Sequence, residues 1–214
     1  HYAFPRVLSI TQPTEVGTCY SLEELRAIKE FCNQHKLKLH IDGARFVYAP
    51  LYLNCSMQQI IDAAQPSTLS FGGTKNGLLY GEAVLVFDPD IKDLKFIRKQ
   101  FMQLPSKMRF LSAQFCSLFE NNLHEEIPRH GHQMATYLNE KLKPIESIDV
   151  MYPVQANSVF PKLPKAWTKT LKNDMFFYIY DEHEWVARWM CSYDTTTDEI
   201  DQFVEKIAQL SKQD

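Results

Sequence analysis

Two short stretches of this 214-residue chain carry residue types that suit chemistry on a bound ligand. They are residues 40–45 (HIDGAR) and residues 70–77 (SFGGTKNG). Each stretch ends a run of residues that we interpret as a β-strand, and in open α/β sheets ligands bind beyond the carboxyl ends of the strands. If the two strands are parallel members of one sheet, Asp42, Arg45 and Lys75 converge on one crevice.

Lys75 is a candidate nucleophile because of the small residues around it. Gly72, Gly73 and Gly77 leave room for a flat ring to approach the backbone. A lysine packed among them would lose part of its hydration, which favours the neutral, nucleophilic amine and suits Schiff-base chemistry. Considered alone, a lysine in a turn is more often a solvated surface residue.

Asp42 and Arg45 add a carboxylate and a guanidinium to the same predicted crevice. A buried carboxylate at a strand end can pair with a pyridinium nitrogen, which makes the ring an acceptor for carbanion electrons. The planar fork of Arg45 suits a carboxylate or phenolate oxygen. An Asp-Gly pair alone is usually a turn. Spacing therefore gives only a weak case for a pyridoxal-phosphate (PLP) site.

Several segments together resemble the low-specificity threonine aldolase family. They are residues 8–15 (LSITQPTE), 40–45 and 70–77, in the order and spacing of that family. Residues 106–110 (SKMRF) and Arg188, shortly before residues 191–194 (CSYD), look like further landmarks. The resemblance runs through most of the chain. It implies an α/β fold of the fold-type-I PLP-dependent transferase class and PLP as the cofactor.

The resemblance also implies roles for individual residues. Lys75 would bind PLP covalently, and Asp42 would pair with the pyridine nitrogen. Arg45, beside the cofactor, and Arg188 would hold the substrate carboxylate. Arg109 would match an arginine that reaches the cofactor phosphate across a dimer interface. The implied assembly is a homodimer or homotetramer.

The implied reaction is retro-aldol cleavage of L-threonine or L-allo-threonine to glycine and an aldehyde. The same scaffold supports β-elimination and transamination, so a related β-eliminating lyase is one alternative. A truncated, non-catalytic fragment is the other. A visible absorbance band after PLP is added would argue against that fragment.

The elements that position these residues follow from hydrophobic periodicity and capping signals. A strand, a helix opened by a capping box at Ser21, and a second strand form a βαβ unit, which implies a parallel sheet covered by helices. The predicted strands are 7–10, 37–41, 68–71 and 83–87, and the predicted helices are 21–34, 57–63, 91–120 with a break at Pro105, and 128–143. Residues 83–87 are nearly all apolar, as in a strand buried on both faces.

Composition changes after Pro144. Short β-like stretches follow at 159–160, 175–180 and 185–191, and a capping box at Thr196 opens a last amphipathic helix. We therefore expect two domains: residues 1–125 as the C-terminal part of a PLP-binding large domain, and residues 126–214 as a small α+β domain.

Charge and composition exclude several classes of partner. The net charge is −3 with no long Lys/Arg block, so nucleic acid and anionic membranes are not expected as main partners. No apolar run approaches the roughly 18 residues of a membrane-spanning helix. Five cysteines without a Cys-x-x-Cys pair favour a reducing cytoplasm over a disulfide framework. His124, His130 and His132 lack a neighbouring metal-ligand pattern, so we predict no metal.

The chain has only 7 glycines and begins with His1. Phosphates are commonly cradled by glycine-rich loops at helix N-termini, and no such loop is evident beyond the segments above. We expect that the N-terminal part of the large domain is missing and that this chain alone is inactive.

Overall fold

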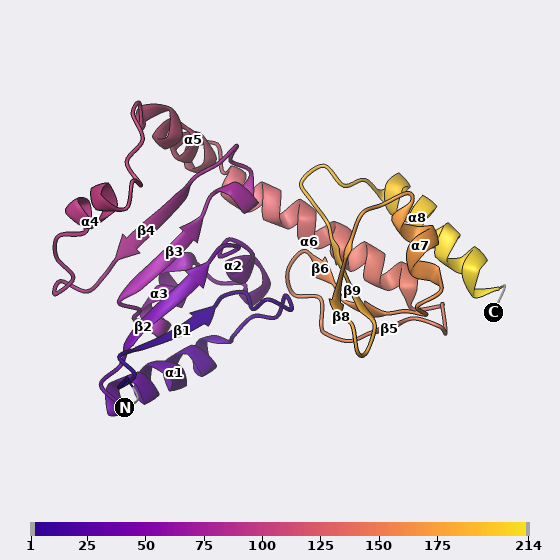
Figure 1. The fold of residues 1–214 in the computed structure, drawn as a ribbon, viewed down its shortest axis with the longest axis horizontal. Helices are drawn as coiled ribbons and strands as arrows, with labels where there is room; N and C mark the ends of the chain where they lie inside the picture. Colours follow the sequence, from indigo (N-terminus) through magenta and orange to yellow (C-terminus); the bar gives the residue numbers. More distant parts are fainter. Residues whose placement is uncertain (1–2, 213–214) are drawn as a thin grey trace. The chain divides into compact units, whose positions relative to one another are not determined.

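The computed structural model describes residues 3–212, which form two compact units (Figure 1). Of the described residues, unit 1 comprises 3–14 and 20–127, and unit 2 comprises 15–19 and 128–212. Each unit contains a β-sheet of its own. Asp42, Arg45 and Lys75 all lie in unit 1, whereas Arg188 lies in unit 2.

The sheet of unit 1 has four strands in chain order. They are β1 (Val7–Thr11), β2 (Lys38–Gly43), β3 (Thr68–Gly72) and β4 (Glu82–Val86). β1, β2 and β3 are parallel, whereas β4 runs antiparallel to β3. The four predicted strands are confirmed. The parallel arrangement of β2 and β3 brings their carboxyl ends to one end of the sheet. The turns that follow these strands, which carry Arg45 and Lys75, therefore lie at the same end.

The prediction that residues 83–87 form a strand buried on both faces is wrong. Among the residues that the structure describes, β4 pairs with β3 alone, and Val84 is 64% exposed. A strand on the edge of a sheet has neighbours on one side only, so apolar composition does not guarantee its burial. β4 therefore presents apolar surface and unpaired backbone groups to the surroundings of this chain.

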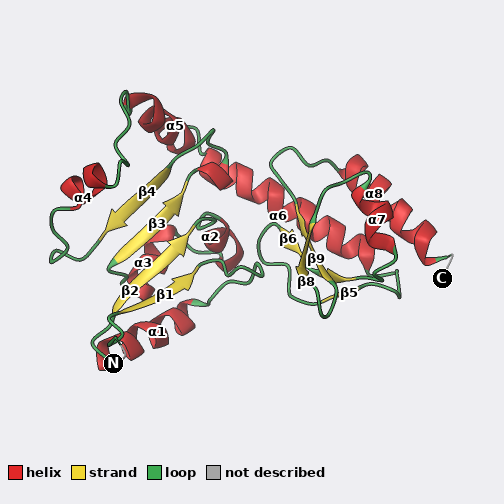
Figure 2. Ribbon diagram, viewed as in Figure 1, coloured by secondary structure: helices red, strands yellow, loops and turns green. Residues whose placement is uncertain are grey.

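Helices connect β1 to β2, β2 to β3 and β3 to β4, and two more helices follow β4 in unit 1 (Figure 2). They are α1 (Leu22–Gln34), α2 (Tyr48–Leu53), α3 (Met57–Ala64), the 3-10 turn η1 (Thr74–Asn76), α4 (Leu94–Gln100) and α5 (Arg109–Glu120). The predicted capping box of α1 is confirmed, since Ser21 and Glu24 bond to each other's backbone amides. The predicted break near Pro105 falls between α4 and α5. α2 was not predicted, and its N-cap Val47 supplies no side-chain cap.

The two faces of the sheet differ in character because side chains alternate along each strand. In β2, Leu39, Ile41 and Gly43 are buried, whereas His40 and Asp42 on the other face are half-buried. Leu25 of α1 and Ile60 of α3 are fully buried as well and belong to the apolar core of this unit. The polar residues thus share the face of β2 opposite to its apolar side chains.

Unit 2 combines a small antiparallel sheet with three helices. The strands are β5 (Asp149–Val150), β6 (Ser158–Val159), β7 (Pro161–Lys162), β8 (Tyr178–Asp181) and β9 (Val186–Met190), and the helices are α6 (Leu123–Leu142), α7 (Trp167–Lys172) and α8 (Thr197–Ser211). The first turn of α6, residues 123–127, belongs to unit 1. The predicted α+β character is confirmed, as is the capping box at Thr196. α6 begins five residues earlier than predicted and contains Pro128 in its second turn, where a proline cannot donate a hydrogen bond to the carbonyl of residue 124 and its ring crowds that carbonyl.

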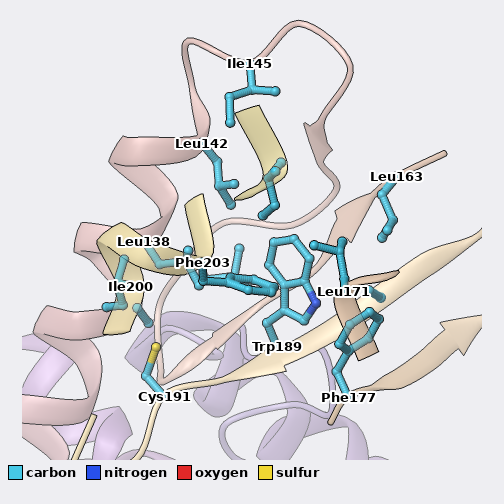
Figure 3. Packing of buried hydrophobic residues seen from close by; sticks show 14 of the residues in the cluster. Leu138, Leu142, Ile145, Leu163, Leu171, Phe177, Trp189, Cys191, Ile200 and Phe203 are labelled. Carbon is cyan, nitrogen blue, oxygen red and sulfur yellow. The ribbon is translucent and has the colours of Figure 1, made fainter. Parts of the chain in front are cut away.

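The core of unit 2 is built around aromatic side chains (Figure 3). The Trp189 ring meets Phe203 at 4.9 Å and Phe177 at 5.9 Å between centroids, both edge-on. Edge-to-face pairs of this kind stabilise a core beyond their area burial. Across the described residues, no helix combines the length and the apolar character needed to cross a membrane. We predicted the domain border between residues 125 and 126, and the two units divide between residues 127 and 128. Residues 15–19 also belong to unit 2, which the prediction did not include.

Candidate active site

Asp42 lies at the carboxyl end of β2, on the polar face of the sheet. It pairs in register with Thr11 of β1 and with Ser70 of β3. Its carboxylate is half-buried, and Oδ1 accepts a 2.9 Å hydrogen bond from the backbone amide of Ala44. This bond fixes the carboxylate at the first turn after the strand.

His40 stands one pleat before Asp42 on the same face. Its Nδ1 lies 2.7 Å from Ser9 Oγ, and its Nε2 lies 3.0 Å from Ser70 Oγ. A polar row therefore crosses β1, β2 and β3 beside Asp42. The structure shows that both ring nitrogens are bonded to hydroxyl groups, which holds the ring in place.

Lys75 occupies the middle of the turn η1, directly after β3. The glycines before it matter for close approach: a Cβ on Gly72 would lie 2.2 Å from the carbonyl oxygen of Ala44. Lys75 itself is exposed. The expectation that packing among small residues desolvates this lysine is therefore wrong for the chain as described. Small neighbours provide space, and space without a covering group admits water.

Asn76 joins the turn after β2 to the turn after β3 by hydrogen bonds. We predicted no role for this residue from the sequence. Asn76 Nδ2 donates hydrogen bonds to Gly72 O at 2.6 Å and to Ala44 O at 3.2 Å. Its side chain is buried, with 1% exposed. The only signal in the sequence was the position of Asn76, next to the lysine in a glycine-rich turn.

The other side of the lysine turn is anchored to the start of β4. The amides of Gly73 and Thr74 donate to Gly81 O, each at 3.1 Å. They also lie 3.2 and 3.4 Å from the carboxylate oxygens of Glu82. Thr74 and Asn76 are thus both tied to neighbouring backbone, and Lys75 projects between them.

The two candidate arginines of unit 1, Arg45 and Arg109, lie on different elements. Arg45 lies in the turn after β2, half-buried and three residues from Asp42, as predicted. Arg109 begins α5 and is exposed, with its guanidinium 4.8 Å from the centroid of the Phe110 ring. Arg45 therefore lies in the turn directly after β2, close in sequence to Asp42, whereas Arg109 lies on a separate helix, α5.

Arg188 lies in β9 of unit 2, opposite Tyr178 of β8. Its Nε is buried and has no hydrogen-bond partner among the described residues. A cavity of about 290 Å³ adjoins it, and the wall contains the aromatic side chains of Phe176, Phe177 and Tyr178. A buried guanidinium nitrogen without a partner is costly and suits an anionic ligand.

The three clustered histidines have structural partners. His130 Nε2 lies 2.8 Å from Thr195 O, His132 Nδ1 lies 2.9 Å from Ala156 O, and the His124 ring contacts the Phe119 ring at 4.9 Å between centroids, tilted by 44°. A second cavity, of about 1000 Å³ in unit 1, is lined in part by Lys29, Cys32 and Asp88; Asp42 and Lys75 are not part of its wall.

Comparison with known proteins decides the family. The family model described as beta-eliminating lyase matches residues 1–165. This chain belongs to the beta-eliminating lyase family. Proteins of this family that act as threonine aldolases or β-eliminating lyases depend on pyridoxal phosphate.

Within the beta-eliminating lyase family, the chain is similar to two curated low-specificity L-threonine aldolases. One, from Pseudomonas aeruginosa, is 38% identical over 208 residues, which is 97% of this chain and 60% of the relative. The other, from a Pseudomonas species (strain NCIMB 10558), is 40% identical over 196 residues, or 91% of this chain and 57% of the relative. The chain thus spans about 60% of the length of the curated relatives it matches.

A solved structure supports the same assignment. The threonine aldolase of Leishmania major superposes with a TM-score of 0.88 at 29% identity, covering 97% of this chain and 61% of that structure. The predicted α/β fold of the fold-type-I PLP enzymes is therefore confirmed for this member of the beta-eliminating lyase family.

Proposed function

We propose that this chain carries the cofactor lysine and substrate-binding groups of a PLP-dependent threonine aldolase. The reaction is the cleavage of L-threonine or L-allo-threonine to glycine and an aldehyde. The proposal rests on the hydrogen bonds between the turns that follow β2 and β3. Asp42 lies at the end of β2, Lys75 projects from the turn after β3, and Asn76 bonds the two turns together. The aldolase names of the similar Pseudomonas and Leishmania proteins support the substrate class.

The residues present fit PLP in their chemistry. An exposed amine, a fixed carboxylate and a glycine that admits close backbone approach lie at the carboxyl ends of two neighbouring parallel strands, β2 and β3. We propose that Lys75 binds the cofactor aldehyde and that Asp42 accepts the ring N–H. Arg45 would lie beside the cofactor, and Arg109 would hold its phosphate. When bound, the cofactor supplies an electron sink for the carbanion left on the substrate Cα.

The chain's own groups orient the substrate. We propose that Arg45 and Arg188 bind the substrate carboxylate, since the bidentate fork fixes both its position and its plane. Fixing the carboxylate aligns the Cα–Cβ bond that breaks, and such alignment supplies a large part of a catalyst's effect. A base removes the β-hydroxyl proton as the bond breaks, and Cα then gains a proton to give glycine. Residues 1–125 would serve as the cofactor domain and residues 126–214 as the substrate-closing domain.

We also propose that the protein works as a homodimer or homotetramer in the cytoplasm. The exposed apolar side chains on and after β4 supply surface that association would bury: Val84, Val86, Phe87, Phe96, Phe101 and Met102. The five cysteines are free thiols, as a reducing compartment favours. Because Lys75 is exposed, we expect this 214-residue chain alone to cleave threonine more slowly than roughly 1 s⁻¹, a modest rate for an enzyme.

Covalent labelling tests the proposal. Purified chain is incubated with PLP, reduced with borohydride and mapped by mass spectrometry of its peptides. We expect the label on Lys75, and its loss in Lys75→Ala without transfer to another lysine. A label confined to other lysines contradicts the assignment of Lys75. With threonine as substrate, glycine as the product supports an aldolase, whereas a keto acid supports the β-eliminating alternative.

A further inference from the structure

Ala44 is bonded to both halves of the candidate site through its two peptide groups. Its N–H donates to Asp42 Oδ1 at 2.9 Å, and its carbonyl accepts from Asn76 Nδ2 at 3.2 Å. Asn76 is the residue next to Lys75. A continuous bonded path therefore leads from the Asp42 carboxylate to the backbone that presents the lysine.

The orientation of the Asn76 amide is fixed by its partners. Both groups that it contacts are carbonyl oxygens, of Gly72 and of Ala44, so the NH₂ end must face them. Its Oδ1 is buried and has no partner among the described residues. An apolar side chain would avoid the cost of that unpaired oxygen. The two donated bonds are what an asparagine contributes here.

Backbone packing makes the two turns interlock. Gly72 lies so close to Ala44 that a Cβ would sit 2.2 Å from its carbonyl oxygen. On the far side, the amides of Gly73 and Thr74 are bonded to Gly81. Asn76 closes the arrangement from the side of β2, so the lysine turn is held at both of its ends.

We propose that Asn76 is a positioning residue that sets the separation between the Lys75 amine and the Asp42 carboxylate. The inference rests on the proposed function, in which both groups contact PLP. The aldehyde carbon and the ring nitrogen of PLP lie on opposite sides of one rigid aromatic ring. The amine and the carboxylate must therefore stand at a fixed spacing, and Asn76 holds the two turns at that spacing.

The test compares Asn76→Ala and Asn76→Asp with matched changes at Asn157. Asn157 is also buried, donates through Nδ2 to a backbone carbonyl (that of Cys191, at 2.7 Å) and has an Oδ1 without a hydrogen-bond partner in the described part of the chain, but it lies in unit 2. The measured quantity is the rate of PLP attachment to Lys75, trapped with borohydride and mapped by peptide, at conditions where circular dichroism shows each protein folded. Hydrogen exchange of the amides of residues 72–78 provides a second readout.

We expect both Asn76 variants to label Lys75 roughly tenfold more slowly or worse, since misplacements of about 1 Å can cost on the order of 10²-fold. Exchange at residues 72–78 should become faster. The Asn157 variants should label at the wild-type rate. In Asn76→Asp, protonation of the carboxyl restores one donor, so the ratio of its rate to the wild-type rate at the same pH should recover as pH falls. Asn76→Ser, which keeps one donor, replaces any variant that fails to fold.

Three results overturn the inference in distinguishable ways. Equal labelling rates in folded wild type and folded Asn76 variants remove the positioning role and leave the proposed function standing. Absence of a Lys75 label on the wild-type chain overturns the proposed function, and this inference with it. Equal slowing by the Asn157 variants would also count against a specific role, because loss of stability alone would then explain the effect.

Discussion

The backbone amide of Ala44 donates a 2.9 Å hydrogen bond to Asp42 Oδ1. The bond fixes the carboxylate at the end of β2. In the proposed function, this carboxylate accepts a hydrogen bond from the N–H of the PLP ring. The bond from Ala44 also makes the role of the charge testable, because an asparagine at this position can still accept the bond through its own Oδ1.

Asp42→Asn should leave the fold and PLP attachment largely unchanged and slow glycine formation on the order of 10²-fold or more, as loss of a preorganised charge does in other active sites. The measurements are the borohydride-trapped label and glycine released per label. Asp62→Asn, at an exposed position of α3, makes the same change of charge and serves as the control. Near wild-type turnover in Asp42→Asn would remove Asp42 from its proposed role.

Arg188→Lys should raise KM for threonine by roughly tenfold, about 1.4 kcal/mol, because the lysine keeps the charge and loses the bidentate fork. PLP attachment should not change. Steady-state kinetics at several threonine concentrations separate the two effects. Arg26→Lys, exposed on α1, is the matched control. Unchanged KM in Arg188→Lys would exclude this residue from carboxylate binding.

Gly72→Ala should destabilise unit 1 by several kcal/mol, because its Cβ would lie 2.2 Å from the Ala44 carbonyl, and backbone cannot move aside cheaply. Gly17→Ala provides the contrast: φ is +81°, but the nearest atom to its Cβ is at 3.5 Å. We expect that change to cost only about 1 kcal/mol of backbone strain. Urea unfolding measures both, and equal losses would show that the close approach at Gly72 is relieved easily.

Burial raises the pKa of the Cys191 thiol from its ordinary 9.0 to about 12. Below pH 9.0 the thiol is protonated in both states, so it makes no pH-dependent contribution there. Between 9.0 and about 12 the unfolded chain loses the proton while the folded chain keeps it, so the free energy of unfolding falls as pH rises. The full loss is about 4 kcal/mol at ~1.4 kcal/mol per pKa unit.

Cys191→Ala should therefore flatten this part of the alkaline loss in stability, measured by urea unfolding at neutral pH and inside that window. Cys116→Ala, at an exposed thiol, should not. The comparison of the two pH values within each variant cancels the cost of the small cavity that alanine leaves. The same pH dependence in wild type and Cys191→Ala would show that the thiol does not titrate as its burial indicates.

Val84→Lys should reduce self-association of the chain, because it places a charge on an exposed apolar edge strand. Asn33→Lys adds the same charge at an exposed position of α1 and should leave association unchanged. Sedimentation velocity over a range of concentrations measures both. Identical behaviour of the two variants would show that the edge of β4 is not where copies meet.

Local patterns in the sequence determined much of the fold. The capping boxes at Ser21 and Thr196 begin α1 and α8 where predicted, since a cap depends on residues three positions apart. The strands β2 and β3 were predictable for the same reason, because an apolar run and the glycine that ends it are local signals. Asp42, Arg45 and Lys75 were chosen on residue type, spacing and family resemblance.

Contacts between distant segments were decided only by the tertiary structure. The exposed edge of β4 depends on which strands flank it, a fact that its own apolar residues do not contain. The bonds of Asn76 to Ala44 and of His40 to Ser9 and Ser70 join residues about 30 positions apart. The parallel register of β1, β2 and β3 brings these groups together. Register is set by the packing of whole strands, so no single stretch of the sequence could specify it.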